Sequence, residues 1–160
     1  MTTKQFGFSL DISRCSGCMA CMVACFDQND LPGNQVAFRH VSKIELGKYP
    51  EGSIAYFSLS CMHCGDAPCV AVCPAGALKK EDENGIVLVN REVCIGCHAC
   101  AVICPFGAPQ FPEGKTMAKC DACISRVNQG MEPACVRTGV FQRSLCVRLR
   151  HLSTQILLKP

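Results

Sequence analysis

Cysteine is the residue that most constrains how this chain folds, because 16 of its 160 residues are cysteine. They fall into four groups whose spacing repeats along the chain. The first three groups are Cys15, Cys18, Cys21 and Cys25; Cys61, Cys64, Cys69 and Cys73; and Cys94, Cys97, Cys100 and Cys104. The fourth group is Cys120, Cys123 and Cys135, and Cys146 follows it. A cysteine content this high is typical of a disulfide scaffold, a metal protein or a redox protein.

A disulfide scaffold requires an oxidising compartment. The first ten residues, MTTKQFGFSL, contain no charged segment followed by a long apolar stretch, and no twin-arginine pair. No window approaches the roughly 18–20 continuous apolar residues that a membrane-spanning helix needs. We therefore expect a cytoplasmic location, no membrane span and no framework of structural disulfides. Export together with a partner that carries its own signal remains open.

The composition argues against two further classes. The formal net charge of +3 is spread along the chain without a dense basic run, so we expect no nucleic-acid partner. The sequence shows no Ser/His/Asp set, no glycine-rich phosphate loop and no paired carboxylates, so we expect no catalytic site. The chain has no Trp, only two Tyr, 13 Gly and 9 Pro. Something besides side-chain packing is therefore expected to hold the fold together.

Short segments of two kinds separate the cysteines. Alternating apolar and polar residues predict strands at residues 4–13, 36–46, 53–60, 77–80 and 86–89, with a turn at Glu81–Gly85. Apolar segments around the cysteines predict one or two helical turns at residues 20–26, 67–73 and 98–104. A further short helix is expected at Ile124–Gly130, ended by its glycine. The pattern predicts an α+β fold of small β-hairpins and short helices.

The cysteine spacing points to iron and sulfide. A C-x2-C-x2-C run brings three thiolates around one point, and a fourth cysteine three residues later, followed by proline, points elsewhere. Bacterial ferredoxins use this run, and their fourth cysteine ligates a second cluster. Residues 94–105 match it residue for residue, and residues 61–74 match it with a longer middle loop. Gly17 and Gly96 lie between ligands and lack a Cβ, so backbone amides there can approach sulfide.

Zinc is the main alternative metal. A structural zinc site usually takes two separated pairs of ligands, which close one tetrahedron. The fourth group alone offers such a pair, but the two runs of three close cysteines and a fourth do not divide into tetrahedra. Iron–sulfur clusters are therefore favoured over a zinc-binding module. His63 and His98 each have a full set of cysteines beside them, so we expect packing or hydrogen bonding from them rather than ligation.

Four segments resemble the iron–sulfur electron-transfer subunits of molybdenum- and tungsten-pterin oxidoreductases. That family includes the small subunits of dimethyl sulfoxide reductase and formate dehydrogenase, and the polyferredoxin subunits of some aldehyde oxidoreductases. The segments are RCSGCMACMVACFDQN (Arg14–Asn29), CMHCGDAPCVAVCPAGA (Cys61–Ala77), CIGCHACAVICPFGAP (Cys94–Pro109) and KCDACISRVNQGMEPACV (Lys119–Val136). The last segment is the most specific, because its pattern is not a general ferredoxin feature.

The resemblance implies tandem ferredoxin-like halves built around up to four [4Fe–4S] clusters. One half would comprise residues 1–60 with 110–140, the other would comprise residues 61–109, and residues 141–160 would form a tail of unclear role. Each implied ligand set combines three close cysteines with one distant cysteine. The implied sets are Cys61, Cys64 and Cys69 with Cys104; Cys94, Cys97 and Cys100 with Cys73; and Cys120, Cys123 and Cys135 with Cys25.

The remaining implied set is incomplete. Cys15, Cys18 and Cys21 would await the last cysteine of the fourth group. Members of the family tend to read PACV-x-x-C-P-T-G there, whereas this chain reads PACVRTGVFQ. Three arrangements are open: Cys146 is a displaced ligand, the cluster has an open iron or is [3Fe–4S], or the site is empty. Three clusters are thus complete by sequence, and the fourth has an uncertain fourth ligand.

The resemblance implies an electron relay and not an enzyme. The chain would pass single electrons between a molybdenum- or tungsten-pterin catalytic subunit and another redox partner. The catalytic subunit would be of formate dehydrogenase, aldehyde oxidoreductase or reductase type, and a further redox subunit or copies of the chain itself are candidate partners. The alternatives are a free, diffusible polyferredoxin and a zinc-binding module. Arg126 is a candidate contact for a partner's cofactor, with a solvent-exposed role as the alternative.

Overall fold

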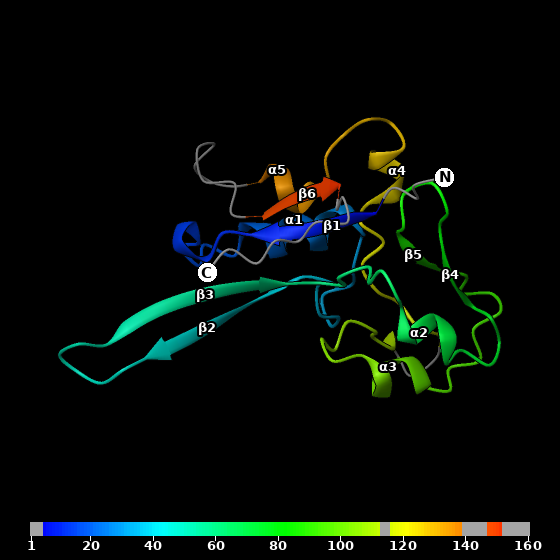
Figure 1. Cartoon of the computed structure of the whole chain (residues 1–160), viewed down its shortest axis with the longest axis horizontal. Coiled ribbons are helices and arrows are strands. Elements are labelled where there is room, and N and C mark those ends of the chain that lie inside the picture. The colour runs from blue at the N-terminus through cyan, green and yellow to red at the C-terminus, as the bar shows by residue number, and fades with distance from the viewer. Residues whose placement is uncertain (1–4, 113–115, 139–146, 152–160) are drawn as a thin grey trace. The chain divides into compact units, whose positions relative to one another are not determined.

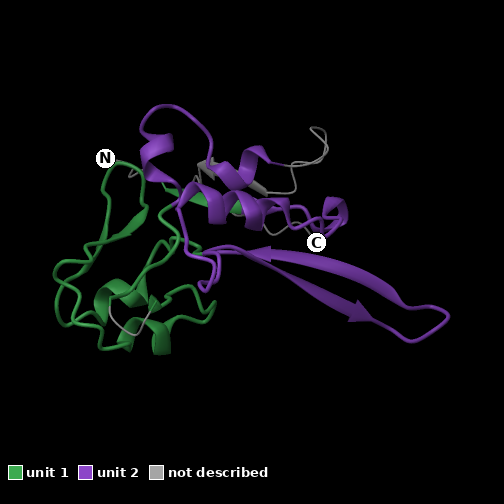
Figure 2. Cartoon of the chain, turned by 180° about the vertical axis from the view of Figure 1, so that it is seen from behind, with its two compact units in different colours: residues 1–8, 61–121, 149–160 green, residues 9–60, 122–148 purple. Residues whose placement is uncertain are grey.

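The computed structural model describes residues 5–112, 116–138 and 147–151, and its elements are short helices and two-stranded antiparallel sheets (Figure 1). The α+β fold class predicted from the sequence is therefore confirmed. The chain divides into two compact units, each assembled from segments that are distant in the sequence (Figure 2). Unit 1 comprises residues 1–8, 61–121 and 149–160, and unit 2 comprises residues 9–60 and 122–148. The extents of the two ferredoxin-like halves stay a prediction.

Unit 1 is built from one short hairpin and two short helices. β4 (Leu78–Lys80) pairs antiparallel with β5 (Val87–Val89). α2 (Pro68–Ala71) begins with a proline, whose fixed φ suits the first turn of a helix, and it packs against α3 (Ala99–Ile103) and β4. The core consists of Ala67, Leu78, Val87, Cys100 and Met117, with Cys64, Cys69, Val70, Cys73, Val89, Cys94 and Phe111 packed against it. Cysteine side chains are therefore a large part of the packed interior.

Unit 2 contains the longest elements of the chain. β2 (His40–Leu46) pairs antiparallel with β3 (Ser53–Leu59) along the full length of both strands, and the two form the long cyan hairpin of Figure 1. α1 (Ala20–Gln28) packs against α5 (Ala134–Arg137), and α4 (Ile124–Val127) precedes α5. A further two-stranded sheet pairs β1 (Phe6–Leu10) with β6 (Val147–His151).

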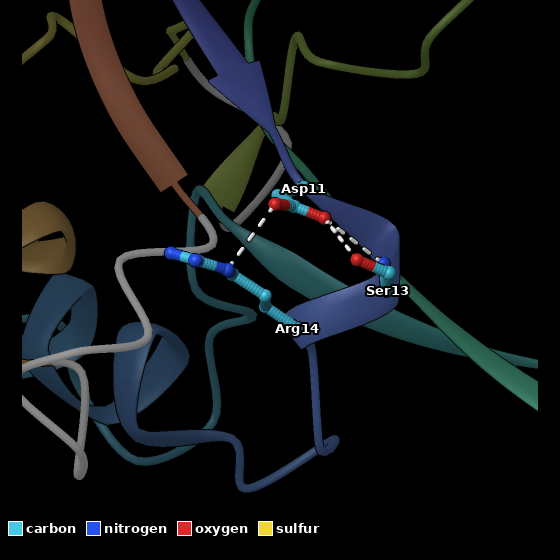
Figure 3. A network of polar contacts seen from close by, with 3 residues as sticks. All are labelled: Asp11, Ser13 and Arg14. Carbon is cyan, nitrogen blue, oxygen red and sulfur yellow. Dashed lines mark hydrogen bonds and ion pairs between the residues drawn. The ribbon is translucent and has the colours of Figure 1, made fainter.

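The chain enters the first cysteine group through the 3-10 helix η1 (Ile12–Arg14), which Asp11 caps (Figure 3). The Asp11 carboxylate accepts hydrogen bonds from the hydroxyl and the backbone N–H of Ser13, at 2.6 and 3.1 Å. Its other oxygen lies 3.5 Å from Nε of Arg14. The Ser13 hydroxyl is the main reason that the pKa of Asp11 lies below its ordinary 3.8, ahead of the charge of Arg14. This cap fixes the turn that leads to Cys15, whose N–H donates to the carbonyl of Ile12.

The predicted elements agree with the structure in type more than in length. β1 to β5 all lie within predicted segments. The helix expected at residues 20–26 continues to Gln28, and the one expected at Ile124–Gly130 ends at Val127, although Gly130 has the left-handed φ of +73° that follows many helix ends. α5 and β6 were not predicted. No helix in the described ranges is long and apolar enough to cross a membrane.

Candidate metal centres

The four cysteine groups share one backbone feature. In each of them the residue before the second cysteine has a positive φ: +71° at Gly17, +47° at His63, +67° at Gly96 and +58° at Ala122. This left-handed residue turns the chain between two cysteines that lie only three positions apart. The repeat that is visible in the cysteine spacing is therefore a repeat of backbone conformation as well.

The first and third groups share a second such residue. Met19 and His98 each follow the second cysteine of their group, and each has φ 61° and ψ 0°. Both stand immediately before a helix, α1 in the first group and α3 in the third. The C-x2-C-x2-C run therefore has the same conformation in both units, and in both it ends in a helix that carries the third cysteine of the run.

Unit 1 holds a cavity in which four cysteines from two groups meet. It is open to solvent on one side, and Cys73, Cys94, Cys97 and Cys100 all line it. The set that the resemblance implies for one cluster is the same four residues. The remaining lining is almost wholly apolar, apart from His98, whose ring stacks on Phe111 at a centroid distance of 3.8 Å. The other lining residues are Ala75, Ala77, Leu78, Val89, Ile95, Phe111 and Met117.

Backbone amides donate to sulfur atoms of this cavity. The N–H of Ala77 donates to Sγ of Cys73 at 3.3 Å, and the N–H of Met117 donates to Sγ of Cys94 at 3.4 Å. Burial raises the pKa of the Cys73 thiol, but nearby backbone N–H groups, that of Ala77 first, lower it below its ordinary value. Iron binds the thiolate form, and amide–sulfur hydrogen bonds are part of how proteins tune iron–sulfur clusters. The donor set and its surroundings therefore fit a [4Fe–4S] cluster.

A second set of four cysteines in unit 1 lies close enough together for its members to raise one another's pKa. Burial is the main cause of the raised pKa of Cys69, and the neighbouring Cys61, Cys104 and Cys64 raise it further. The pKa of Cys64 is raised by burial first, then by Cys61 and Cys104. Only groups that lie near one another affect each other in this way. Cys104 therefore lies near the three cysteines of the second group, as the resemblance implies.

Two lysines of unit 1 place their ammonium groups beside this second set. Nζ of Lys80 donates to the carbonyl oxygens of Cys64, at 3.1 Å, and of Gly65. Nζ of Lys119, a residue that is only 5% exposed, donates to the carbonyl oxygens of Val87 and, at 3.0 Å, of Cys120. The sequence reasoning missed both residues, since nothing in the local pattern separates a buried lysine from a surface one.

His63 lies inside the second group, and its ring is buried. Its Nδ1 accepts a hydrogen bond of 3.1 Å from the N–H of Val87 on β5, and its ring centroid lies 6.3 Å from that of Phe8. The side chain therefore ties the ligand loop to the hairpin of unit 1. This is the packing and hydrogen-bonding role that was expected from the sequence.

In unit 2, Cys25 lies on α1 and is buried near Cys123 and Cys135. Burial is the main cause that raises the pKa of Cys25 from 9.0 to about 11, and both neighbouring cysteines raise it as well. The side-chain amide of Asn29 donates to the carbonyl oxygen of Cys25 at 2.7 Å. Cys120, the fourth member of this implied set, is buried and belongs to unit 1.

The first group lies on the loop that leads into α1. Cys18 is exposed, whereas Cys15 and Cys21 are half-buried. Sγ of Cys21 lies 3.4 Å from Oγ of Ser58 on β3, within hydrogen-bonding distance. Cys146, the candidate displaced ligand, lies outside the described residues, as does the segment 139–145 that precedes it.

Arg39 is a buried cation beside the cysteines of unit 2. It is 1% exposed, and its guanidinium donates to Oγ of Ser58 at 3.1 Å and to Oγ of Ser60 at 2.8 Å. Burial raises the pKa of the Cys135 thiol, and the charge and hydrogen bond of Arg39 act against that rise. Arg39 therefore joins the β3 side of unit 2 to a cysteine of the fourth group. The sequence reasoning did not single it out.

Arg126, for which the sequence allowed two roles, bonds within unit 2. Its Nε donates to the carbonyl oxygen of Glu132 at 2.9 Å, and its guanidinium donates to Oε1 of Gln28 at 3.1 Å. These bonds hold the turn after α4 against the end of α1.

No three or more His, Cys, Asp or Glu side chains within the described ranges are grouped closely enough to hold a single metal ion. A [4Fe–4S] cluster, or cubane, does not need its ligands to converge on one metal ion, because each of the four thiolates binds a different iron of the cluster.

Comparison with known proteins gives matches of two kinds. Residues 14–77 and residues 53–147 each match a 4Fe-4S dicluster domain. The chain is 45% identical over 145 residues to the probable anaerobic dimethyl sulfoxide reductase chain YnfG of Escherichia coli, and 44% identical to an anaerobic dimethyl sulfoxide reductase chain of the same species; each match covers 85% of this chain and 70% of the relative. It is 36% identical to a sulfite dehydrogenase subunit of Allochromatium vinosum, over 82% of this chain and 64% of the relative.

Proposed function

This protein belongs to the family of 4Fe-4S dicluster proteins that includes the iron–sulfur chains of anaerobic dimethyl sulfoxide reductase, and from this we propose that it is the electron-relay subunit of a molybdenum- or tungsten-pterin oxidoreductase. It is an iron–sulfur electron-transfer chain of an oxidoreductase complex and not its catalytic subunit. Its proposed role is to pass single electrons between the catalytic subunit and another redox partner. A formate dehydrogenase, an aldehyde oxidoreductase and a reductase are the candidate types of complex.

The observation that carries this proposal is the cavity of unit 1. Four thiols from two cysteine groups line one apolar space, and backbone amides donate to two of their sulfur atoms. A carrier of single electrons needs a redox group that is held in place in mostly apolar surroundings, and the lining and amide–sulfur hydrogen bonds of this cavity meet that need. Each cubane, when bound, takes up or gives back one electron. The chain's own residues hold the thiolates in place, surround them with apolar side chains and set the local charge.

We assign four ligand sets on this basis. The cavity set is Cys73, Cys94, Cys97 and Cys100, and the other set of unit 1 is Cys61, Cys64, Cys69 and Cys104. The electrostatic coupling of Cys25, Cys123 and Cys135 supports a third set, with Cys120 as its remaining ligand. The fourth set is Cys15, Cys18 and Cys21, with Cys146 as one candidate for its last ligand and an open iron, a [3Fe–4S] cluster or an empty site as the others. We favour the presence of a fourth cluster.

We also propose how the chain is divided, where it is located and which partners it binds. Residues 1–60 with 110–140 and residues 61–109 form the two proposed ferredoxin-like halves. The relatives are named as chains or subunits of larger enzymes, which supports a docked subunit over a free carrier. We place the chain in the cytoplasm, with a further redox subunit or copies of itself as additional candidate partners.

The test is purification of the native chain without oxygen, followed by iron analysis and EPR spectroscopy. We expect a brown protein that absorbs broadly near 400 nm, with about 16 iron atoms per chain for four full cubanes or about 12 for three. The proteins that purify with it should include a pterin-containing catalytic subunit. A colourless zinc-containing chain would reject the proposal. A brown chain that elutes alone on size exclusion of native extract would replace the docked subunit with a diffusible polyferredoxin.

A further inference from the structure

The two candidate sites of unit 1 differ in the charges that surround them. Among the described residues, no Lys, Arg, Asp or Glu side chain lines the cavity of Cys73, Cys94, Cys97 and Cys100. At the site of Cys61, Cys64, Cys69 and Cys104, Nζ of Lys80 donates to the carbonyl oxygen of Cys64. Nζ of Lys119 donates to the carbonyl oxygens of Val87 and Cys120, and its charge acts on Cys69. The two sites are also close neighbours, because Cys64 and Cys69 of one site pack against the same core as Cys73 and Cys94 of the other, and Cys100 belongs to that core.

Lys119 is the more deeply placed of the two cations. Its side chain is buried, and its ammonium group donates to backbone carbonyl oxygens, those of Val87 and Cys120. Neither lysine has a carboxylate within ion-pair distance among the described residues. Within the part of the chain that the structure describes, no carboxylate pairs with Lys119, and its positive charge acts on Cys69 through poorly screening surroundings.

Lys80 adds a second positive charge, next to the loop that carries Cys64. Its ammonium group is bonded to the carbonyl oxygens of Cys64 and Gly65, so it is held against the backbone of a predicted ligand. Lys80 is only partly buried, whereas its neighbour Lys79 on β4 is exposed and points to the opposite face of the strand. Solvent screens Lys80 more than Lys119, so its effect is the smaller of the two.

Amide hydrogen bonds raise the potential of the cavity site, so they oppose the difference that the two lysines create between the sites. The cavity site receives N–H···S bonds from Ala77 and Met117, and such bonds also favour the more negative state of a cluster. A peptide group is a dipole of about 3.5 D, whereas a lysine carries a full unit charge, whose interaction falls off more slowly with distance. Because of this longer range, we infer that the two lysines outweigh the two amides.

We propose that Lys80 and Lys119 make the site of Cys61, Cys64, Cys69 and Cys104 the higher-potential of the two sites in unit 1, so that an electron entering this unit rests there. The proposal rests on the assignment of these cysteines as cluster ligands. Uptake of the electron makes the site more negative by one charge, and the adjacent ammonium groups stabilise that charge. The electron comes from one redox partner and leaves to another, with no bond made or broken and no proton transferred.

The test is a redox titration of the anaerobically purified full-length chain, followed by EPR spectroscopy and iron analysis. Of the two components that unit 1 contributes, Cys104→Ala should remove the one that is reduced first, whereas Cys94→Ala should leave that component in place. At the wild-type midpoint potential of this component, Lys119→Met should lower the ratio of reduced to oxidised protein about tenfold, which corresponds to about 59 mV for one electron. Lys80→Met should lower it by less.

Two kinds of control variant separate an effect of charge on the midpoint potential from a structural effect: variants that keep the positive charge, and a variant of an exposed lysine. Lys80→Arg and Lys119→Arg should restore most of the wild-type ratio, and Lys79→Met should leave it unchanged. If Lys119→Met loses its iron, Lys80→Met and Lys80→Arg alone test the inference. Unchanged midpoints in Lys80→Met with full iron content, or loss of the first-reduced component in Cys94→Ala, would overturn the inference. A wild-type chain without iron or an EPR signal would instead reject the proposed function.

Discussion

Single residues explain how cysteines three positions apart come to face one centre. The residue before the second cysteine of each of the four cysteine groups has a positive φ, a conformation that costs a non-glycine residue about 1–2 kcal/mol. Two groups use glycine there, at Gly17 and Gly96, and the other two use His63 and Ala122. The hydrogen bond from the N–H of Val87 to His63 is a compensating interaction that glycine would not offer. The ligand loops therefore require the left-handed backbone conformation at this position, and glycine, histidine and alanine all adopt it there.

Gly17 is the position where this demand is strictest. Its φ is +71°, and a Cβ added there would lie 2.6 Å from the ring carbon Cζ of Tyr56. We expect Gly17→Ala to destabilise the iron-loaded protein by about 2–4 kcal/mol, since the substitution adds both backbone strain and overpacking. Gly76→Ala is the matched control, because Gly76 has φ +60° with no atom within 4 Å of its Cβ position, and only the strain of about 1 kcal/mol remains. Denaturant unfolding measures both, and equal losses would show that Tyr56 yields to the methyl group.

Arg39 is the residue whose removal should most affect the cysteines of unit 2. Its guanidinium bonds two serine hydroxyls and favours the thiolate form of Cys135 against the effect of burial on the pKa of that thiol. We expect Arg39→Met to lower the iron content per chain and to destabilise the protein by about 2–3 kcal/mol, because buried polar groups lose a charged partner. Arg137→Met is the control, since Arg137 lies on the same helix as Cys135 and is exposed. Iron analysis should separate the two variants, and an Arg39→Met protein with full iron would contradict the expectation.

At the scale of elements, the cysteine-bearing segments are too short to be stable by themselves. α2 and α3 have four and five residues, and β4 and β5 have three each. Isolated helices shorter than about 12 residues and isolated two-stranded hairpins are marginal in water. These elements therefore depend on packing against one another and on the ligands that they carry. The hairpin of β2 and β3 is longer, with seven residues in each strand, and it supplies Ser58 to the surroundings of Cys21.

Leu78 on β4 tests how far the hairpin of unit 1 depends on its apolar face. Its side chain is 3% exposed, belongs to the core and lines the cavity of Cys73 and Cys94. We expect Leu78→Ala to cost about 3 kcal/mol of stability through the enlarged cavity, and to speed the loss of iron to a chelator. Lys79→Ala on the opposite face of the same strand is the control and should change neither property. The expectation fails if Leu78→Ala loses iron at the wild-type rate.

At the scale of the whole molecule, the interior holds too little apolar surface for a chain of this length. Many of its buried hydrophobic residues are cysteine or alanine, and Ile86, Val87, Met117 and Val136 are among the few large ones that are nearly inaccessible. Ligation deprotonates the cysteines, so the proposed clusters would change the formal charge from +3 to about −3 with three cubanes or about −5 with four. Buried cations such as Arg39 and Lys119 then oppose negative charge inside the protein.

Removal of iron should therefore unfold the chain. We expect treatment with an iron chelator and ferricyanide to abolish the cooperative thermal transition and to increase the hydrodynamic radius, because the ligands no longer hold the short elements together. Circular dichroism and size-exclusion chromatography measure the two effects. EDTA alone, at a concentration that strips structural zinc, is the control and should leave the brown protein folded. A compact, iron-free chain that still melts cooperatively would show that side-chain packing is sufficient.

The chemistry of the ligands and the local shape around them follow from the sequence alone. Thiol spacing is a local property, since a gap of two residues fixes which cysteines share a turn, and strand alternation is local in the same way. The strands β1 to β5 and the iron–sulfur family were therefore predictable. α5 was not, because its four residues after Pro133 offer no period long enough to detect.

The surroundings of each candidate site, in contrast, depend on how the segments fold back on one another. Arg39 lies 96 positions before Cys135, and Lys119 lies 50 positions after Cys69, yet each acts on that thiol. The cavity likewise joins Cys73 to a run that begins 21 positions later. Coulomb interactions and packing depend on distance in space, and spacing along the chain does not give that distance. The kind of redox group could thus be predicted from the sequence, whereas the charges that tune it could not.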